Sequence, residues 1–156
     1  MDYALDQGVN FFDTAEMYAV PPKPETYGRT EEIIGEWFTT RRNRDQVVLA
    51  TKVGGRAPHF TWVREGKARS DKANIVEALN NSLQRLKTDY IDLYQLHWPD
   101  RPANRFGQLG YDHDAQAEAE AQAVPILETL EALDEQVKAG KIRHIGLSND
   151  TPWGLM

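Results

Sequence analysis

The stretch YIDLYQLHW, residues 90–98, is rich in β-branched and aromatic residues and predicts a strand that is apolar on both faces. Three further runs of the same kind lie at residues 9–14, 47–53 and 142–149. Strands that are apolar on both faces are typical of a parallel sheet covered by helices. The sequence therefore predicts four strands in one parallel sheet.

Helical patterns separate these runs. Apolar residues recur at near-helical spacing over residues 75–86, after Ser70 or Asp71 as a cap, and again over residues 126–137. A third helix is predicted over about residues 30–40, with two glutamates favourably placed in its first turn. Its expected buried stripe consists of Ile33, Ile34, Trp37 and Phe38.

The alternation of strands and helices requires βαβ units, which occur in an open doubly wound sheet or in a (β/α) barrel. A Rossmann-type sheet carries G-x-G-x-x-G after its first strand, and this motif follows none of the predicted strands. Polar residues stand instead at the ends of several strands, which is the pattern of a barrel active site. We therefore favour an α/β fold of the (β/α)8 TIM-barrel type, with residues 1–156 in one domain.

Four apolar runs end on, or next to, a polar residue: Asp13, Lys52, His97 and Asn149. Burying a charged or polar side chain is unfavourable unless it finds a partner. Four such residues at matching places in successive strands therefore indicate one shared site.

Tyr18 lies five positions beyond Asp13, so it can lean back over the end of the first strand. A lysine ammonium beside the phenol would favour its ionised form and make the hydroxyl a better acid at neutral pH. Lys52 could do this, with Asp13 as its counter-charge, while His97 could orient a carbonyl oxygen. Together these residues predict a site that donates a proton to a developing alkoxide.

Each of these residues also has a structural explanation. Asp13 could cap a helix, Tyr18 could be a half-buried aromatic residue, Lys52 a surface charge and His97 a core histidine; only the combination favours a site. A metal-dependent hydrolase is a weaker alternative, because it needs clustered ligands at strand ends. The second candidate ligand, His144, lies early in its strand, so we expect no metal site.

Four segments closely resemble the aldo-keto reductases, in family order: GVNFFDTAEMY (8–18), LATKV (49–53), SLQRLKTDYIDLYQLHWPD (82–100) and GKIRHIGLSN (140–149). The segment YAVPPKPETYGRTE, residues 18–31, is most similar to the bacterial Tas-type branch. The resemblance covers nearly the whole chain. It implies a (β/α)8 barrel that reduces aldehydes or ketones with a nicotinamide cofactor, usually NADPH and less often NADH.

The resemblance assigns the catalytic tetrad of the family to Asp13, Tyr18, Lys52 and His97. In that assignment Tyr18 is the proton donor, Lys52 makes it more acidic, Asp13 holds Lys52 in place, and His97 positions the carbonyl group. Hydride transfer is then the chemistry of the cofactor, and the protein supplies orientation and electrostatics. Substrate contacts are expected from Tyr18, His97 and Trp98.

The resemblance also places Ser148 and Asn149 at the nicotinamide carboxamide, with Asp13 close to the cofactor. An asparagine side chain suits a carboxamide, because it offers one donor and one acceptor. Asn149 could equally cap a helix that begins near Thr151.

The family barrel has eight strands, and this chain shows only about four βα units, the second to fifth strands. We therefore expect a partial chain that reduces carbonyl compounds weakly or not at all by itself. The alternative is a non-catalytic binding or assembly module derived from the same fold, which could associate with itself through open sheet edges.

Two predicted loops after strands are long, residues 54–70 and 100–122. The first carries Phe60 among basic residues, and the second includes Arg105. Long βα loops lie over the active face of a barrel, so both could shape a substrate pocket. For the Ala-, Glu- and Gln-rich tract at 112–122, the low-complexity composition favours a flexible surface segment.

Composition excludes several other classes of protein. A chain of 156 residues with 40% hydrophobic and 27% charged residues is typical of one soluble globular domain. The net charge of -6, with scattered Lys and Arg, argues against nucleic acid as a partner. The absence of cysteine excludes disulfides and favours the cytoplasm. No apolar run is long enough to span a membrane, so we expect no membrane insertion.

Overall fold

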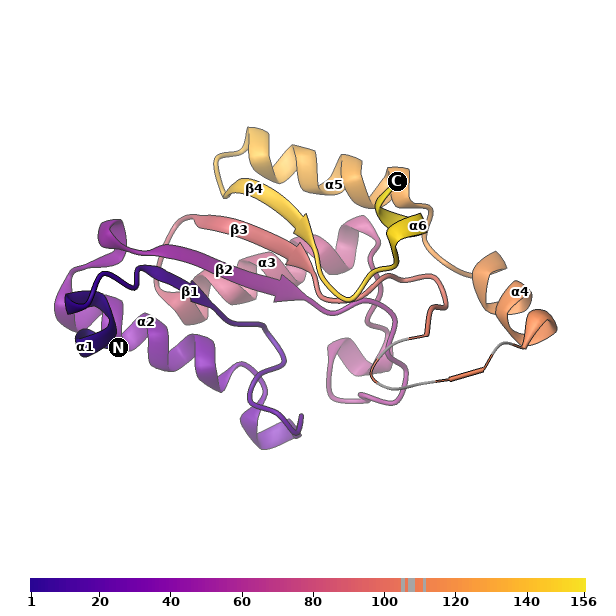
Figure 1. Cartoon of the computed structure of the whole chain (residues 1–156), viewed down its shortest axis with the longest axis horizontal. Helices are drawn as coiled ribbons and strands as arrows, with labels where there is room; N and C mark the ends of the chain where they lie inside the picture. Colours follow the sequence, from indigo (N-terminus) through magenta and orange to yellow (C-terminus); the bar gives the residue numbers. More distant parts are fainter. Residues whose placement is uncertain (105, 107–108, 111) are drawn as a thin grey trace.

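The computed structural model describes residues 1–104, 106, 109–110 and 112–156, so Arg105 of the second long loop lies outside the described residues. Four strands form one sheet in the order in which they occur along the chain (Figure 1). They are β1 (Phe11–Asp13), β2 (Val48–Val53), β3 (Ile91–Leu96) and β4 (Ile142–Leu147). All three neighbouring pairs are parallel, which confirms the predicted sheet.

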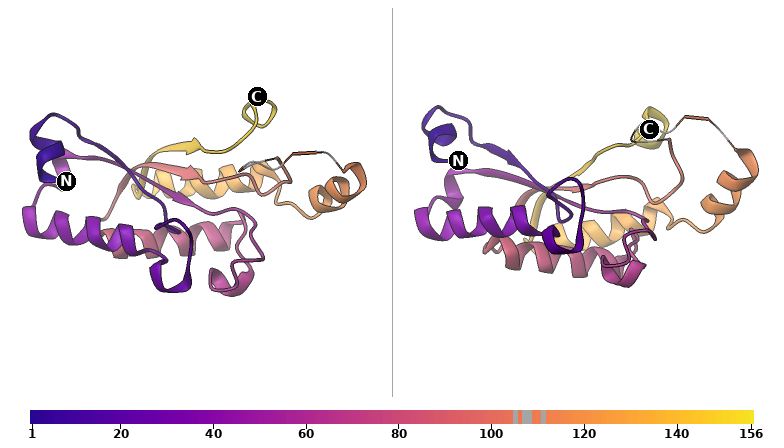
Figure 2. Two further views of the ribbon diagram at one scale, coloured as in Figure 1. Left: turned by 60° about the horizontal axis from the view of Figure 1, so that its bottom comes forward. Right: turned by 90° about the horizontal axis from the view of Figure 1, so that it is seen from below.

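Three long helices cover one face of this sheet: α2 (Arg29–Arg41), α3 (Lys72–Leu86) and α5 (Ile126–Lys138) (Figure 2). Shorter helices are α1 (Asp2–Asp6), α4 (His113–Ala121) and α6 (Pro152–Leu155), with 3₁₀ turns at Pro24–Thr26, Arg44–Gln46 and Arg64–Gly66. No helix within the described residues combines the length and the apolar character needed to cross a membrane. The chain thus folds into two layers, a parallel sheet and the helices that cover one of its faces.

The main core lies between the helix layer and the two central strands. Leu49 and Tyr94 from the sheet are fully buried, as is Leu79 of α3, and Leu133 of α5 is 1% exposed. Each such side chain contributes about 1.5–3 kcal/mol by burial. The core therefore fixes the strands from the helix side and leaves their carboxyl ends free to carry polar groups.

Helices α2 and α3 approach each other closely at Gly35. A Cβ at this position would press on the backbone carbonyl oxygen of Arg85 and lie 2.7 Å from the carbonyl carbon of Leu86. Both neighbours are main-chain atoms, which cannot move aside as a flexible side chain can. The missing side chain of Gly35 therefore sets the distance between the two helices.

A charge cluster holds the amino end of the sheet, opposite the end where the strands finish. The Asp92 carboxylate accepts hydrogen bonds from Arg44 at 2.7 Å, from Arg143 at 2.9 Å and from the Leu49 backbone N–H at 3.0 Å. Both guanidinium groups also lie over the Tyr90 ring, at 3.9 and 4.1 Å from its centroid. One carboxylate thus ties three segments together.

The outer strands and helices are more exposed than the sequence pattern predicted. Phe11 of β1 is 52% exposed and Ile145 of β4 is 41% exposed, and these two strands lie at the edges of the sheet. In α5 the predicted apolar stripe is partly exposed, with Leu127 at 64%. Ile33 of α2 was predicted to be buried, but it is 46% exposed. The prediction of self-association through these edges stays a prediction.

The tract at residues 112–122, whose composition favoured a flexible surface segment, contains helix α4. The Asp112 side chain caps its first turn by accepting a hydrogen bond from the Ala115 N–H at 3.1 Å. Alanine has the highest intrinsic helix propensity, so this composition forms a helix without burying an apolar face. The low-complexity interpretation was therefore wrong about secondary structure, although α4 does lie on the surface.

Candidate active site

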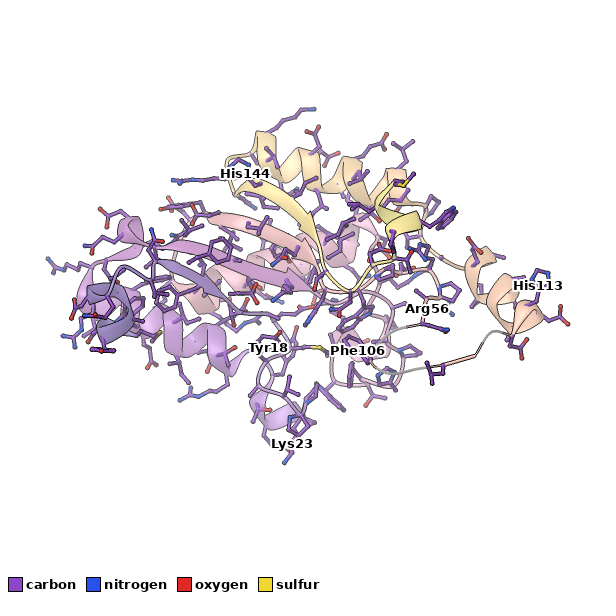
Figure 3. The ribbon with its side chains drawn as sticks, viewed as in Figure 1. Tyr18, Lys23, Arg56, Phe106, His113 and His144 are labelled. Atoms are coloured by element: carbon purple, nitrogen blue, oxygen red, sulfur yellow. The ribbon has the colours of Figure 1, made fainter. Side chains whose placement is uncertain are left out.

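A cavity of about 570 Å³ opens beyond the carboxyl ends of the strands. Four predicted site residues line it: Tyr18, His97, Trp98 and Asn149. The rest of its wall is largely apolar and includes Met17, Phe60 and Phe106. Figure 3 shows Tyr18 and Phe106 on the same side of the molecule, away from His144 on β4. Both long loops therefore contribute to the cavity, as expected.

Lys52 of β2 is 5% exposed, and its ammonium group has partners on the neighbouring strand. It forms an ion pair with the Asp13 carboxylate and donates to the Thr14 carbonyl at 2.9 Å. Asp13 also accepts a hydrogen bond from Gln95 Nε2 at 3.1 Å. A buried ammonium group with these partners is held in one position. Lys52 and Asp13 thus lie together, behind the cavity wall.

The Tyr18 ring lies between this ion pair and the cavity. The Lys52 Nζ is 5.2 Å from its ring centroid, and the His97 ring meets it edge-on at 5.6 Å between centroids. Within the described part of the chain, the Tyr18 hydroxyl makes no hydrogen bond. The structure therefore brings Asp13, Lys52, Tyr18 and His97 together, and it leaves the phenol group available to a ligand.

His97 follows β3 and is 6% exposed. Its Nδ1 is buried, with no hydrogen-bond partner among the described residues. Burial, followed by the positive charge of Lys52, lowers the pKa of His97 to about 4. The imidazole is therefore neutral at pH 7. A bare, unpartnered Nδ1 favours the tautomer with its proton on Nε2, because a buried N–H without an acceptor is the more costly arrangement.

This shift predicts that acid destabilises the chain through His97. Because the pKa falls from 6.5 in the unfolded chain to about 4 in the folded chain, the unfolded chain binds more protons within this window. Stability from this residue is complete above pH 6.5 and is lost as the pH falls towards 4, by about 3 kcal/mol in all.

Urea unfolding of the wild type, His97→Gln and His144→Gln at pH 7.5 and pH 4.5 measures this contribution. We expect His97→Gln to lose less free energy of unfolding between the two pH values than the wild type does. His144, which is exposed, provides the matched control and should follow the wild type. Equal pH dependence in all three proteins would contradict the assignment.

Asn149 joins the ends of β3 and β4. Its Nδ2 donates to the His97 carbonyl at 2.9 Å and to the Ser148 hydroxyl at 3.0 Å. The cap of α6 is Thr151, whose hydroxyl accepts from the Gly154 N–H at 3.1 Å, so Asn149 is not the helix cap. The alternative left open by the sequence is thereby removed.

These contacts leave suitable groups for a carboxamide. Within the described residues, the Asn149 side-chain oxygen has no donor, and the Ser148 hydroxyl accepts a hydrogen bond while its own hydrogen stays available. Together they offer one acceptor and one donor, which is what an amide group requires. Ser148 and Asn149 therefore fit the nicotinamide end of a cofactor.

Sequence reasoning missed a buried acidic residue beside the site, Glu16, which is 1% exposed. Its carboxylate accepts from Arg64 at 2.7 and 3.0 Å, from the Gly54 N–H at 2.8 Å and from the Tyr27 hydroxyl at 2.8 Å. Burial alone would raise the pKa of Glu16, but these bonds and the Arg64 charge outweigh it and lower the pKa. No local sequence pattern marks Glu16, because its partners Gly54 and Arg64 lie 38 and 48 residues away.

No group of three or more His, Asp or Glu side chains in the described part of the chain could hold a metal ion. His144, the second histidine considered at sequence level, lies on β4 away from the cavity (Figure 3). The hydrolase alternative therefore gains no support.

A parallel sheet whose strands follow the order of the chain, with ionisable groups at its carboxyl ends, is the arrangement found in (β/α)-barrel proteins. The sequence profile of the Aldo/keto reductase family matches residues 1–156. The chain belongs to this family of oxidoreductases. Its sequence is 49% identical over all 156 residues to the protein Tas of Escherichia coli K12 and covers 44% of that protein. The chain thus spans less than half the length of this curated relative.

Solved structures agree with the fold. An aldo/keto reductase from Klebsiella pneumoniae, crystallised with NADP and acetate, is 33% identical with a TM-score of 0.62; the match covers 96% of this chain and 38% of the other. The holo form of a Bacillus halodurans aldo-keto reductase is 36% identical with a TM-score of 0.61, covering 94% and 39%. These (β/α)8 barrels confirm the fold class, with about four βα units present.

Proposed function

We propose that this site reduces the carbonyl group of an aldehyde or ketone, with NADPH as hydride donor and Tyr18 as proton donor. The main support is that Tyr18 and His97, which follow two different strands, line one cavity, and that Lys52 of a third strand lies against the Tyr18 ring. The family supports an oxidoreductase, and neighbours with bound NADP or NADPH support that cofactor over NADH. In this proposal residues 1–156 are part of one barrel domain.

Each side chain has one task in the proposed reaction. Neutral His97 donates a hydrogen bond from Nε2 to the carbonyl oxygen and orients it. Tyr18 gives its phenol proton to that oxygen as negative charge develops there. Lys52 stabilises the phenolate that remains, and Asp13 keeps the ammonium group beside the ring. Trp98 closes the cavity next to His97, with 4.9 Å between the two ring centroids.

Three residues would hold the cofactor end of the site. Asn149 accepts a hydrogen bond from the carboxamide through its free oxygen, and Ser148 donates one through its hydroxyl. Asp13, whose side chain is 45% exposed, is the third residue that we propose for the cofactor. When bound, NADPH supplies the hydride that goes to the carbonyl carbon.

The test grafts residues 1–156 in place of the matching segment of the K. pneumoniae reductase, whose structure contains NADP. We expect the graft to oxidise NADPH when 4-nitrobenzaldehyde or cyclohexanone is added, measured by the loss of NADPH absorbance. The 156-residue chain alone, assayed in parallel, should be weakly active or inactive. A folded graft that binds NADPH but reduces neither compound, while the parent enzyme does, contradicts the proposal.

A further inference from the structure

Four segments of the chain converge on the Glu16 carboxylate. Glu16 itself lies in the turn between β1 and Tyr18, and Gly54 follows Lys52 by two residues. Arg64 belongs to the long loop after β2, and Tyr27 precedes α2. All three partners donate to the two oxygens of the carboxylate, at 2.7 to 3.0 Å. One buried anion therefore links the Tyr18 turn to the segments that carry Tyr27, Gly54 and Arg64.

A small apolar cluster rests against this network and forms the cavity wall. Its buried members are Met17, Ala57 and Trp98, and Tyr18, Tyr27 and Phe60 pack against them. A Cβ on Gly54 would lie 3.2 Å from the Trp98 ring and 3.5 Å from a Glu16 oxygen. Gly54 therefore lies between the aromatic wall and the ion pair and touches both.

The backbone of Arg64 provides an independent observation. Arg64 and Glu65 have φ values of 47° and 57°, in the left-handed region that residues with side chains seldom adopt. Such conformations persist where the surroundings over-determine them, and they concentrate at functional sites. The Arg64 side chain is 5% exposed and also donates from Nε to Asn74 of α3 at 2.9 Å. The contacts of the Arg64 side chain therefore hold the loop backbone in a conformation that it would not adopt by itself.

We propose that Glu16 is a positioning residue, whose ion pair with Arg64 holds the Tyr18 turn and the Phe60 wall in one arrangement at the cavity. The inference rests on the proposed function for its purpose, since Tyr18 is the group that is positioned. The arrangement of the Tyr18 turn, however, can be measured without any enzymatic turnover. Without the ion pair, the Tyr18 turn loses its connection to the loop that carries Phe60, and the Tyr18 ring moves relative to His97.

Solution NMR of the full 156-residue chain tests this directly, through the nuclear Overhauser effect between the Tyr18 and His97 rings, 5.6 Å apart. With only six tyrosines and four histidines, selective labelling resolves the pair, and Tyr18→Phe assigns it. In Glu16→Gln we expect the signal to fall about threefold, which corresponds to a ring displacement of about 1 Å, enough to cost a site about 100-fold in rate.

Glu31→Gln is the matched control. Glu31 is also fully buried, pairs with Arg85 at 2.7 Å and accepts from Thr51 at 2.6 Å, but it lies under the sheet and not at the cavity. Its replacement should lower the free energy of unfolding and leave the ring-to-ring signal unchanged. Equal loss of signal in both variants would mean general loosening and would overturn the proposal.

Two further variants keep the test decisive if Glu16→Gln does not fold. The double variant Glu16→Gln/Arg64→Met removes the unpaired buried cation, so it should fold, yet it should still show the weakened signal. Arg64→Lys retains a cation and should keep most of the signal. A full signal in the double variant overturns the proposal. An inactive graft with these NMR results would refute carbonyl reduction alone and leave the positioning role standing.

Discussion

Replacing Tyr18 with phenylalanine in the grafted reductase is expected to lower kcat for carbonyl reduction by about 10³-fold, the usual contribution of a positioned general acid. The change removes one hydroxyl, which makes no hydrogen bond within the described residues, and keeps the ring that contacts His97 and Lys52. The fold and the affinity for NADPH should therefore be preserved. Steady-state kinetics with 4-nitrobenzaldehyde and a fluorescence titration with NADPH measure both.

Tyr3→Phe provides the control for this experiment, because Tyr3 is 77% exposed in α1 and does not line the cavity. It should leave kcat unchanged. Tyr18→Phe that keeps more than about a tenth of the activity would exclude Tyr18 as the principal acid. A parallel loss of NADPH affinity would show that the substitution disturbs binding and not proton donation.

Replacing Gly35 with alanine is expected to lower the free energy of unfolding by about 2–3 kcal/mol, measured by urea denaturation. Helix propensity by itself predicts the opposite, since alanine exceeds glycine by about 1 kcal/mol inside a helix. The contact decides the sign, because the added Cβ meets the main chain of Arg85 and Leu86. Relief requires α2 and α3 to separate, which opens the core between them.

Glu36→Ala is the neighbouring control, at an exposed position of the same helix. It should change the free energy of unfolding by less than about 0.5 kcal/mol. Gly35→Ala that is as stable as the wild type would mean that the helices can separate without loss. That result would contradict the close approach at Gly35.

Local composition was sufficient to predict the order of the elements and the parallel sheet. The runs that became β2 and β3 are largely buried, so their apolar composition reflects their true environment. Ile33 was placed in the core incorrectly, because helical spacing cannot show how wide the neighbouring surface is. Residues 112–122 were interpreted as a flexible surface segment because helix α4 has no apolar face, so periodicity gives no signal.

In the candidate site, too, some residues could be predicted from the sequence and others could not. Asp13, Lys52 and His97 could be predicted together, because parallel strands bring their carboxyl ends to one edge of the sheet. Glu16 could not, since its partners Gly54 and Arg64 lie 38 and 48 residues away and no local pattern links them. Such contacts depend on loop conformation, which composition alone does not determine.

The Asp92 cluster separates the residues that stabilise the sheet from the residues proposed for chemistry. Its carboxylate and two arginines stabilise the amino end of the sheet, while the groups proposed for chemistry occupy the opposite end. Because no residue of this cluster lines the cavity, we expect substitutions in the cavity to leave the cluster intact, and a stronger cluster to leave the cavity unchanged. Substrate range and thermal tolerance can therefore be engineered, or can diverge, as two separate traits of one sheet.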